Sequence, residues 1–317
     1  MTRLTLAICA RNAQDIVGEC LESIQNQTSP ADEVIVAVDD LSDPTVAVAE
    51  QYGARVIASN TTGLYEARNA ILDACTTEYL AFTDADCVLA PEWVATAKRV
   101  FDEHADVAAG TGRHPPIGKR NFASWLHHQW YIVETLTTGE TDGVIGGNSY
   151  FRADALRAVG GWLKLPRRSA AEDLYISGAL RRAGYRIWFD EGAAVSHNYE
   201  TSLRGLWRKS VMMGEDAVVM MRAAGWRGSL WWYTMAIPVM ALAMVLGVAL
   251  LFVLPVVGLS VVGALLIASL AFLAARFGSL RAALPRCVAR WVIIWPYGWG
   301  ILRGLVATIP ESARAGA

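Results

Sequence analysis

The chain has 317 residues, of which 54% are hydrophobic and 18% are charged, and its formal net charge at pH 7 is −2. A chain so rich in apolar residues and so poor in charge is neither an intrinsically disordered protein nor one that coats nucleic acid. The charge is unevenly distributed, with a balance of −7 up to Gly228 and +5 after it. An acidic front part is therefore joined to an apolar, sparsely basic back part.

Short apolar segments alternate with helical patterns through the front part. Strands are predicted at residues 4–10, 33–38, 55–58 and 79–83, with amphipathic helices between them. Strands that alternate with helices at this spacing indicate an α/β fold, with a mostly parallel sheet and helices on both faces. The first apolar segment is too short for a signal sequence, so we expect this domain, residues 1–200, to stay in the cytoplasm.

Acidic residues follow two of the predicted strands. Asp39 and Asp40 follow one strand, and Asp84 and Asp86 follow another. The carboxyl ends of parallel strands form the ligand-binding edge of such a sheet, and alternate carboxylates can share a Mg²⁺ ion. The same residues could instead be solvated loop residues. No glycine-rich phosphate loop occurs in this half, so a nucleotide would be held through a metal ion and acidic groups.

The chain contains five cysteines, at positions 9, 20, 75, 87 and 287. They form no CxxC pattern and no Cys/His spacing typical of a metal site. Proteins of a reducing compartment keep such thiols free of disulfides. We therefore expect reduced thiols with a structural role.

Several ordered motifs resemble a known family. They are ICARN, VAVDDLSDPT, GLYEARNAIL and EYLAFTDADC, followed by VIGGNSYFRADALRAVGGW and AEDLYISGALRRAGYRIWFDEGAAVSH. Together they cover roughly residues 3–200 and resemble the family 2 glycosyltransferases. The resemblance implies a GT-A fold, which is a Rossmann-like mixed sheet, in an enzyme that uses a nucleotide sugar together with Mg²⁺ or Mn²⁺.

The resemblance also implies roles for residues that would bind the nucleotide. Asp39 matches the carboxylate that bonds to the uracil or ribose, and Arg68 matches a basic residue near the diphosphate. Asp84 and Asp86 match the DxD motif of the family. Asp86 is then the expected direct ligand of the metal ion, and Asp84 a second ligand that lies nearer the ribose.

Later motifs match the sugar-binding and acceptor half of the family. Gly146, Gly147 and Asn148 match the segment that lines the donor sugar. Asp173 matches the general base of inverting members, which removes a proton from the acceptor hydroxyl; the alternative is a helix cap or a favourable contact with the helix dipole. His197 matches a position that sometimes completes the metal site, and the alternative is a satisfied interior histidine.

A basic amphipathic pattern fills the segment 201–228, which joins the two parts of the chain. Apolar residues recur there at helical spacing, with Arg204 and Arg208 between them. Such a helix beside a membrane lies in the interface, and its basic groups could hold the phosphate of a lipid carrier. They could also be ordinary positive-inside anchors. The segment lacks the QxxRW motif of the family's processive synthases, which favours transfer of a single sugar.

A run of 48 residues, from Gly228 to Ala275, contains no charged residue and no histidine. Two membrane-spanning helices, at about 229–254 and 259–276, fit this run, with Pro255 and Gly258 as the turn. A pair of very hydrophobic core helices is the alternative. Arginines flank both ends of the run, so both ends are expected on the cytoplasmic side.

A last apolar segment, 288–310, completes the predicted membrane region 229–317. Pro296 and two nearby glycines are expected to break or bend a helix there. The segment could span the membrane, or it could be re-entrant or interfacial. Arg303 is a candidate for binding a lipid phosphate, because an arginine at membrane depth usually has a partner. The alternative is that its side chain extends to the interface.

These patterns lead to one main hypothesis and two alternatives. The main hypothesis is an inverting glycosyltransferase of the cell membrane that moves one sugar from a UDP- or GDP-linked donor. The acceptor would be lipid-linked, a polyprenyl or dolichyl phosphate or diphosphate as used in lipid-linked oligosaccharide assembly and glycosylation. One alternative is a polyprenyl-phosphate sugar synthase, in which a phosphate is the acceptor. The other is a non-catalytic membrane subunit of a glycan assembly complex.

Overall fold

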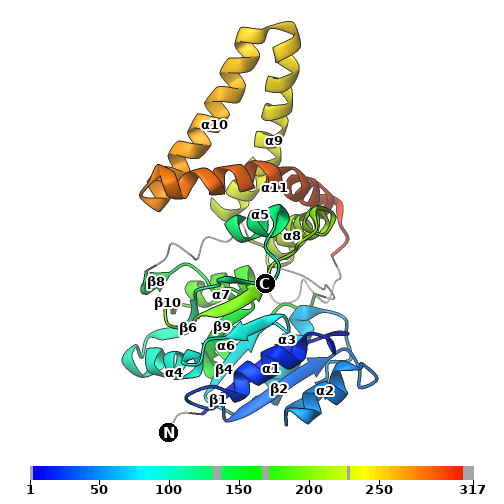
Figure 1. The fold of residues 1–317 in the computed structure, drawn as a ribbon, viewed down its shortest axis with the longest axis vertical. Helices are drawn as coiled ribbons and strands as arrows, with labels where there is room; N and C mark the ends of the chain where they lie inside the picture. The colour runs from blue at the N-terminus through cyan, green and yellow to red at the C-terminus, as the bar shows by residue number, and fades with distance from the viewer. Residues whose placement is uncertain (1–2, 131–136, 166–170, 227–228, 310–317) are drawn as a thin grey trace. The chain divides into compact units, whose positions relative to one another are not determined.

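The computed structural model describes residues 3–130, 137–165, 171–226 and 229–309. These residues divide into two compact units. The first unit, an α/β domain, holds the described residues up to 118 and those from 137 to 198. The second unit is helical and holds residues 119–130 and 199–309 (Figure 1). The segment 119–130, which the sequence placed in the first domain, thus groups with the later helices. The ends of the predicted junction and membrane regions, 227–228 and 310–317, lie outside the described residues.

The first unit is built on a large mixed sheet. Its strands are β1 (Leu4–Cys9), β2 (Glu33–Val38), β3 (Arg55–Ala58), β4 (Tyr79–Thr83), β6 (Val107–Gly112), β8 (Gly139–Thr141), β9 (Asn148–Arg152) and β10 (Arg186–Asp190). In the described part of the chain their order is β3-β2-β1-β4-β9-β6-β10-β8. Strands β3, β2, β1 and β4 are parallel to one another, and β9 runs antiparallel to both β4 and β6. The predicted mostly parallel α/β sheet is therefore confirmed.

Helices cover both faces of this sheet. One core cluster combines alternate residues of β1, Leu4, Leu6 and Ile8, with buried side chains of three helices. Those helices are α1 (Val17–Gln25), α2 (Thr45–Gln51) and α4 (Trp93–Glu103). Helix α3 (Leu64–Ala74) also packs on β1 and β2, and a right-handed crossover from β3 to β4 places it on the opposite face. Strands covered on both sides are apolar throughout, which explains the continuous run EVIVAV in β2.

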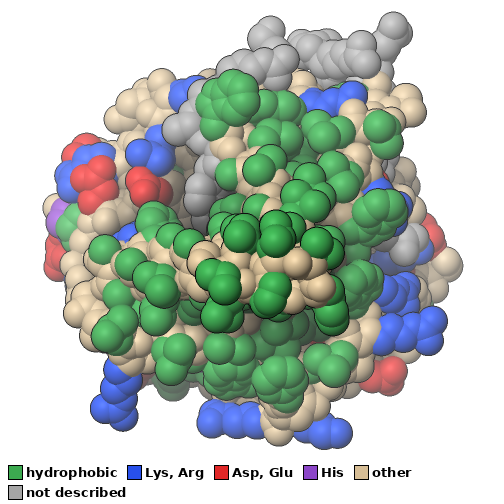
Figure 2. All heavy atoms as spheres, turned by 90° about the horizontal axis from the view of Figure 1, so that it is seen from above, with side chains coloured by type: hydrophobic (Ala, Val, Ile, Leu, Met, Phe, Trp, Pro, Cys, Tyr) green, Lys and Arg blue, Asp and Glu red, His purple; other side chains and the backbone are tan. Residues whose placement is uncertain are grey.

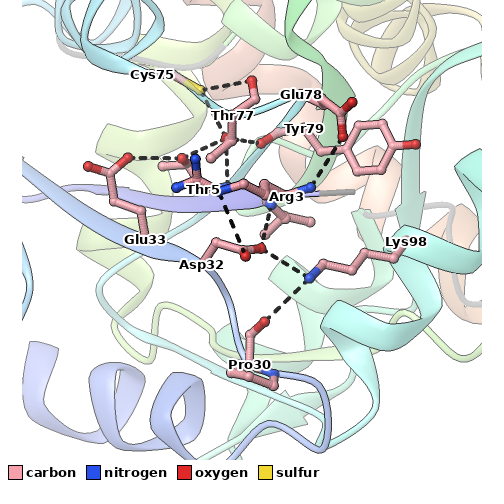
Figure 3. A network of polar contacts seen from close by, with 11 residues as sticks. Arg3, Thr5, Pro30, Asp32, Glu33, Cys75, Thr77, Glu78, Tyr79 and Lys98 are labelled. Carbon is pink, nitrogen blue, oxygen red and sulfur yellow. Dashed lines mark hydrogen bonds and ion pairs between the residues drawn. The ribbon is translucent and has the colours of Figure 1, made fainter. Parts of the chain in front are cut away.

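The amino edge of the sheet is closed by polar contacts (Figure 3). The Asp32 carboxylate accepts hydrogen bonds from the backbone N–H of Leu4 at 2.8 Å and from Lys98 Nζ at 3.1 Å. The Thr5 hydroxyl donates to Glu33 at 3.1 Å, and its oxygen lies 2.7 Å from that of Thr77. The starts of β1, β2 and β4 are held together in this way, so this edge is occupied by structural contacts.

A second, smaller sheet lies in the same unit. It is ordered β5 (Cys87–Leu89), β11 (Val195–Asn198) and β7 (Pro116–Ile117). Strands β5 and β11 are antiparallel, and their register pairs His197 with Cys87. Two short helices, α6 (Ala153–Ala158) and α7 (Glu172–Arg182), complete the unit.

The second unit consists of helices. They are α5 (Phe122–Trp130), α8 (Leu203–Ala223), α9 (Ser229–Val253), α10 (Pro255–Phe277) and α11 (Leu280–Val306). Helix α11 packs closely on α8, because glycines replace side chains where the backbones meet. A side chain at Gly300 would collide with the carbonyl of Val211, and one at Gly214 with the carbonyl of Tyr297.

Two helices of the described chain are long and apolar enough to cross a membrane, namely Thr234–Val253 within α9 and Pro255–Phe277. Few of their side chains are buried, and hydrophobic side chains cover the surface of this hairpin in Figure 2. The alternative of a buried core pair does not describe them. The predicted turn at Pro255 and Gly258 is wrong in detail. Proline suits the first position of a helix, so α10 begins at Pro255 and Gly258 lies inside it.

Helix α11 continues through Pro285 and Pro296, so of the predicted break or bend near Pro296 the break is wrong. Tight packing against α8 supports the backbone at this point, since Gly300 contacts the α8 backbone directly. Near the end of α11, Arg303 Nε lies 3.0 Å from the Glu215 carboxylate of α8. Arg303 thus has a protein partner, while about half of its side chain stays exposed.

Candidate functional site

A pocket opens at the carboxyl ends of β1 and β2. Its volume is about 190 Å³, and its wall includes Cys9, Arg11, Asp39 and Ser59. Arg11 Nε lies 3.2 Å from Asp39 Oδ2, and both side chains are partly exposed. Asp39 therefore presents an oriented, accessible carboxylate beside the pocket. Sequence alone does not single out Arg11, but its place two residues after the first strand is the signal that points to it.

A cluster of metal-binding groups lies after β4. Asp84, Asp86, Cys87 and His197 each bring one ligand atom to it, and these atoms all lie within 4.8 Å of one another. His197 Nε2 lies 3.6 Å from Asp86 Oδ1, and Cys87 Sγ lies 3.9 Å from the same oxygen. Carboxylate oxygen, imidazole nitrogen and thiolate sulfur are common ligands of divalent metals. The residues present fit a divalent cation, and the predicted ligands Asp84, Asp86 and His197 lie together.

The pairing of β5 with β11 brings His197 to the DxD motif. Residues directly opposite each other on antiparallel strands direct their side chains to the same face, and His197 lies opposite Cys87. The ring of His197 is buried and stacks on that of His114, with 4.8 Å between the ring centroids. Cys87 is the residue that the sequence missed. It has no recognisable spacing to His197 along the chain, because the two meet only through strand pairing.

The backbone at Gly146 and Gly147 passes close to two carboxylates. A side chain at Gly147 would collide with the carboxylate of Asp84, and one at Gly146 would collide with that of Glu172. A side chain at either position would displace the carboxylate that it meets. The Gly146–Gly147 segment thus lies beside Asp84 of the DxD motif, and its predicted contact with a donor sugar stays a prediction.

Asn148 follows these glycines as the first residue of β9 and is fully buried. Its side-chain amide accepts a hydrogen bond from Trp93 Nε1 at 2.8 Å and donates to the carbonyls of Arg113 and Ala193, each at 2.9 Å. Both the oxygen and the nitrogen of the Asn148 amide are thus hydrogen-bonded to protein groups. Asn148 holds the strand end in place, and the direct contact with a donor sugar that was predicted for it stays a prediction.

Arg68 is also buried, at 2% exposure. Its Nη2 donates to the carbonyl of Gly146 at 3.0 Å and lies 3.4 Å from Glu172 Oε1. The guanidinium also lies over the ring of Phe82, 4.6 Å from its centroid. Arg68 therefore connects α3 to the Gly146 loop and to the start of α7. The predicted role of Arg68 beside a diphosphate stays a prediction.

Glu172 and Asp173 form the first turn of α7. Burial, followed by the neighbouring Asp173, raises the pKa of Glu172 to about 8, although Arg68 opposes the shift. Burial also raises the pKa of Asp173, against the backbone N–H groups of Leu174 and Gly146, which lower it. Asp173 keeps part of its surface accessible, whereas Glu172 is buried. Of the two side chains, that of Asp173 is the more accessible.

The start of α7 also bears on the alternative role of Asp173. The N-cap is Ala171, with a φ of 102°, and its side chain caps nothing. Asp173 is therefore not the N-cap residue, although a contact with the helix dipole is available to it in the first turn. A non-glycine residue at positive φ is costly, so the entry into α7 is held by its surroundings.

The remaining predicted residues lie in the second unit. Arg204 and Arg208 are exposed on the first turns of α8, next to the exposed side chains of Leu203 and Trp207. This is the mixed basic and apolar surface that an interfacial helix carries. Their predicted contact with lipid phosphate, like that of Arg303, stays a prediction.

Comparison with known proteins gives a consistent picture. Residues 5–160 match the family described as "Glycosyl transferase family 2". The chain is 28% identical over 109 residues to "Putative glycosyltransferase EpsH" of Bacillus subtilis, covering 33% of this chain and 32% of that protein. It is 39% identical over 90 residues to "4,4'-diaponeurosporenoate glycosyltransferase" of Staphylococcus aureus, covering 26% and 24%. The matches thus span about a third or less of these relatives.

Among solved structures, the fold resembles the mannosyltransferase PcManGT of Pyrobaculum calidifontis, crystallised with GDP-Man and Mn²⁺. The TM-score is 0.61 at 20% identity, over 96% of this chain and 87% of that one. A likeness at this identity establishes the fold. Residues 5–160, just under half of the chain, therefore match glycosyl transferase family 2, and the protein has a GT-A-like fold followed by two long apolar helices.

Proposed function

We propose that this protein transfers a single sugar, with inversion, from a UDP- or GDP-linked donor to a lipid-linked acceptor at the cytoplasmic face of the membrane. The observation that carries the proposal is the cluster of Asp84, Asp86 and His197 after β4, at the same edge of the sheet as the pocket beside Asp39. Ligands of open α/β sheets bind at this edge. The match of residues 5–160 to family 2 supports the reaction class.

The donor end of the reaction would be handled at the carboxyl ends of β1, β2 and β4. Asp39, oriented by Arg11, would accept hydrogen bonds from the base or ribose of the nucleotide. Asp84, Asp86 and His197 would hold a Mg²⁺ or Mn²⁺ ion, which supplies positive charge against the charge that develops on the leaving diphosphate. PcManGT, which was crystallised in complex with GDP-Man and Mn²⁺, has a similar fold.

Asp173 would remove the proton from the acceptor hydroxyl. A carboxylate within hydrogen-bond reach can act as a general base, and a raised pKa brings it closer to neutral pH, where base catalysis is most efficient. Glu172 lies next to it and pairs with Arg68, so it would position α7 and would not meet the acceptor. The two acidic residues thus have separate parts in the proposal.

The acceptor part of the proposal rests on the second unit. Its exposed apolar hairpin suits a membrane, and the arginines of α8 suit lipid phosphates. One relative, 4,4'-diaponeurosporenoate glycosyltransferase, is named for a different acceptor. That compound therefore belongs among the acceptors to be tested.

The test is a donor screen on the full chain in membranes or detergent. UDP- and GDP-linked sugars are offered with lipid extract, with polyprenyl phosphate or with 4,4'-diaponeurosporenoate, and lipid products are identified by mass spectrometry. We expect one donor to give a lipid product carrying one added sugar, dependent on Mg²⁺ or Mn²⁺. Absence of product with every donor would contradict the proposal and favour a non-catalytic membrane subunit.

The Asp173→Asn variant tests the base. We expect turnover to fall about 10²- to 10⁴-fold, the range typical of general acid–base catalysis, with donor binding unchanged. Asp154→Asn, which changes an acidic residue in the first turn of α6, is the matched control. Full activity of Asp173→Asn would refute the assignment and indicate a phosphate acceptor, from which no proton needs to be removed.

A further inference from the structure

The metal cluster contains a sulfur donor that a magnesium site does not need. Cys87 directly follows the DxD motif, and its Sγ lies 3.9 Å from Asp86 Oδ1. The ligand atoms of Asp84, Asp86, Cys87 and His197 are mutually within 4.8 Å. The set consists of two carboxylates, one thiol and one imidazole. Such a mixture of ligands differs in its metal preference from carboxylates alone.

The thiol is held in the cluster by the fold. Strand β5 begins at Cys87 and pairs with β11 so that Cys87 lies opposite His197, on the same face of the small sheet. Cys87 is 1% exposed and His197 is 4% exposed. Strand pairing fixes both backbones, and burial restricts both side chains, so the two residues are held in the cluster.

Two of the donor separations come close to those of a small four-coordinate ion, and the whole set lies within 4.8 Å. Zinc binds sulfur at about 2.3 Å and nitrogen or oxygen at about 2.0–2.2 Å, so tetrahedral ligands lie roughly 3.3–3.8 Å apart. The two separations from Asp86 Oδ1, 3.6 Å to His197 and 3.9 Å to Cys87, are close to this range. Magnesium, in contrast, requires oxygen ligands in octahedral geometry and does not use thiolates.

We propose that Cys87 makes this cluster a zinc-binding site, in which Zn²⁺ is held by Asp84, Asp86, Cys87 and His197 and excludes the ion that supports transfer. On binding, the Cys87 thiol gives its proton to solvent and its sulfur forms the bond to zinc. With four protein ligands, no open position is left for a nucleotide diphosphate, as in structural zinc sites. Zn²⁺ is then an inhibitor; this last step alone rests on the proposed transferase activity.

The direct test uses Co²⁺ as a spectroscopic substitute for zinc in the full chain. A cobalt–thiolate bond gives an intense near-ultraviolet charge-transfer band, which carboxylate and imidazole ligands do not give. We expect this band in the wild type and its removal by an equivalent of Zn²⁺. A wild-type protein that binds Co²⁺ without the band would overturn the proposal, whatever any variant does.

Two variants identify the thiol. Cys87→Ser is expected to abolish the band and to weaken Zn²⁺ binding by about 100-fold, the upper end of the loss caused by disturbing a metal ligand's support. Binding of Mn²⁺ is expected to change by less than about threefold, since Mn²⁺ depends on the oxygen and nitrogen ligands. Cys20→Ser is the matched control, because Cys20 is a buried thiol nearby that donates to the Asp84 carbonyl and contributes no ligand.

The outcomes separate this inference from the proposed function. A band that persists in Cys87→Ser and disappears in Cys20→Ser would assign the bond to Cys20 and refute the role of Cys87. If Cys87→Ser does not fold, the spectra of Cys87→Ala and of the wild type still decide whether Cys87 binds the metal ion. Zinc binding with the band but without sugar transfer from any donor would refute only the transferase. Sugar transfer without the band would refute only the zinc site.

Discussion

The carboxylates at the two edges of the large sheet have different surroundings. At the amino edge, Asp32 is surrounded by donors and cations (Figure 3). Burial alone would raise its pKa, but the Leu4 N–H and Lys98 lower it overall. At the carboxyl edge, burial raises the pKa values of Glu172 and Asp173. The surroundings of Asp32 stabilise its charged form, whereas burial disfavours the charged forms of Glu172 and Asp173.

Under the proposed function, this difference separates a structural carboxylate, Asp32, from two carboxylates at the candidate site, Glu172 and Asp173. A group whose charged form is stabilised in the fold adds to stability at neutral pH, whereas a buried acid with a raised pKa subtracts from it. Such destabilising groups occur at functional sites, because a pKa closer to neutral pH makes a carboxylate a better acceptor of protons. The comparison therefore predicts that substitutions at the carboxyl edge affect activity more than stability, and that the amino edge shows the reverse.

The largest effect is expected from Asp86→Asn at the carboxyl edge. Because a bound cation offsets several kcal/mol of developing charge, turnover should fall on the order of 10³-fold. Mn²⁺ binding, measured by calorimetry on the purified full chain, should fall with it. Stability in a thermal melt without metal should stay close to the wild-type value. A variant that kept Mn²⁺ affinity and turnover would remove Asp86 from the site.

Gly147→Ala should give the next largest effect. The added methyl group would collide with the carboxylate of Asp84, and a displacement of about 1 Å costs about 100-fold in rate. Gly263→Ala is the control, since a side chain there would meet no atom within 4 Å. Steady-state turnover of both variants with the preferred donor checks this prediction. Equal rates in the two variants would show that Asp84 tolerates displacement.

Glu172→Gln should change how stability depends on pH. The folded protein holds this proton up to a pKa of about 8, whereas a free glutamate loses it near 4.5. The contribution of Glu172 to the free energy of unfolding is present in full below pH 4.5 and is lost as pH rises toward 8. The variant should therefore lose less stability than the wild type over this window, as thermal melts across a pH series would measure. Parallel curves would mean that Glu172 is already ionised.

Asp32→Asn, at the amino edge, should give the smallest effect. Its effect on the free energy of unfolding should depend on pH in the opposite direction to that of Glu172→Gln. The pKa of Asp32 is lowered, so its contribution is present above the unfolded value of 3.8 and is lost as pH falls. Near neutral pH the free energy of unfolding of the variant should be about 1 kcal/mol below that of the wild type, a loss typical of one hydrogen-bonded group. In acid the two proteins should be equally stable. Turnover should be unchanged. A large loss of turnover would contradict the division between the two edges.

The sequence by itself determined the parts that depend on neighbouring residues. The alternation of apolar segments and helices predicted the strands β1 to β4, which the structure has with nearly the same ends. The order of motifs predicted the family and the GT-A-like fold, and the absence of charge over 48 residues predicted the two long apolar helices. Periodicity and composition are local properties, so they can be read before the chain is folded.

Only the tertiary structure decided which side chains meet. It placed Cys87 opposite His197, buried Asn148 among protein partners, and brought Arg68 to Glu172 across more than a hundred residues. It also kept α11 helical through Pro296, in a helix that packs closely on α8 through glycines. Strand register and packing join residues far apart in the chain, and the free energy of these contacts exists only once both partners are in place.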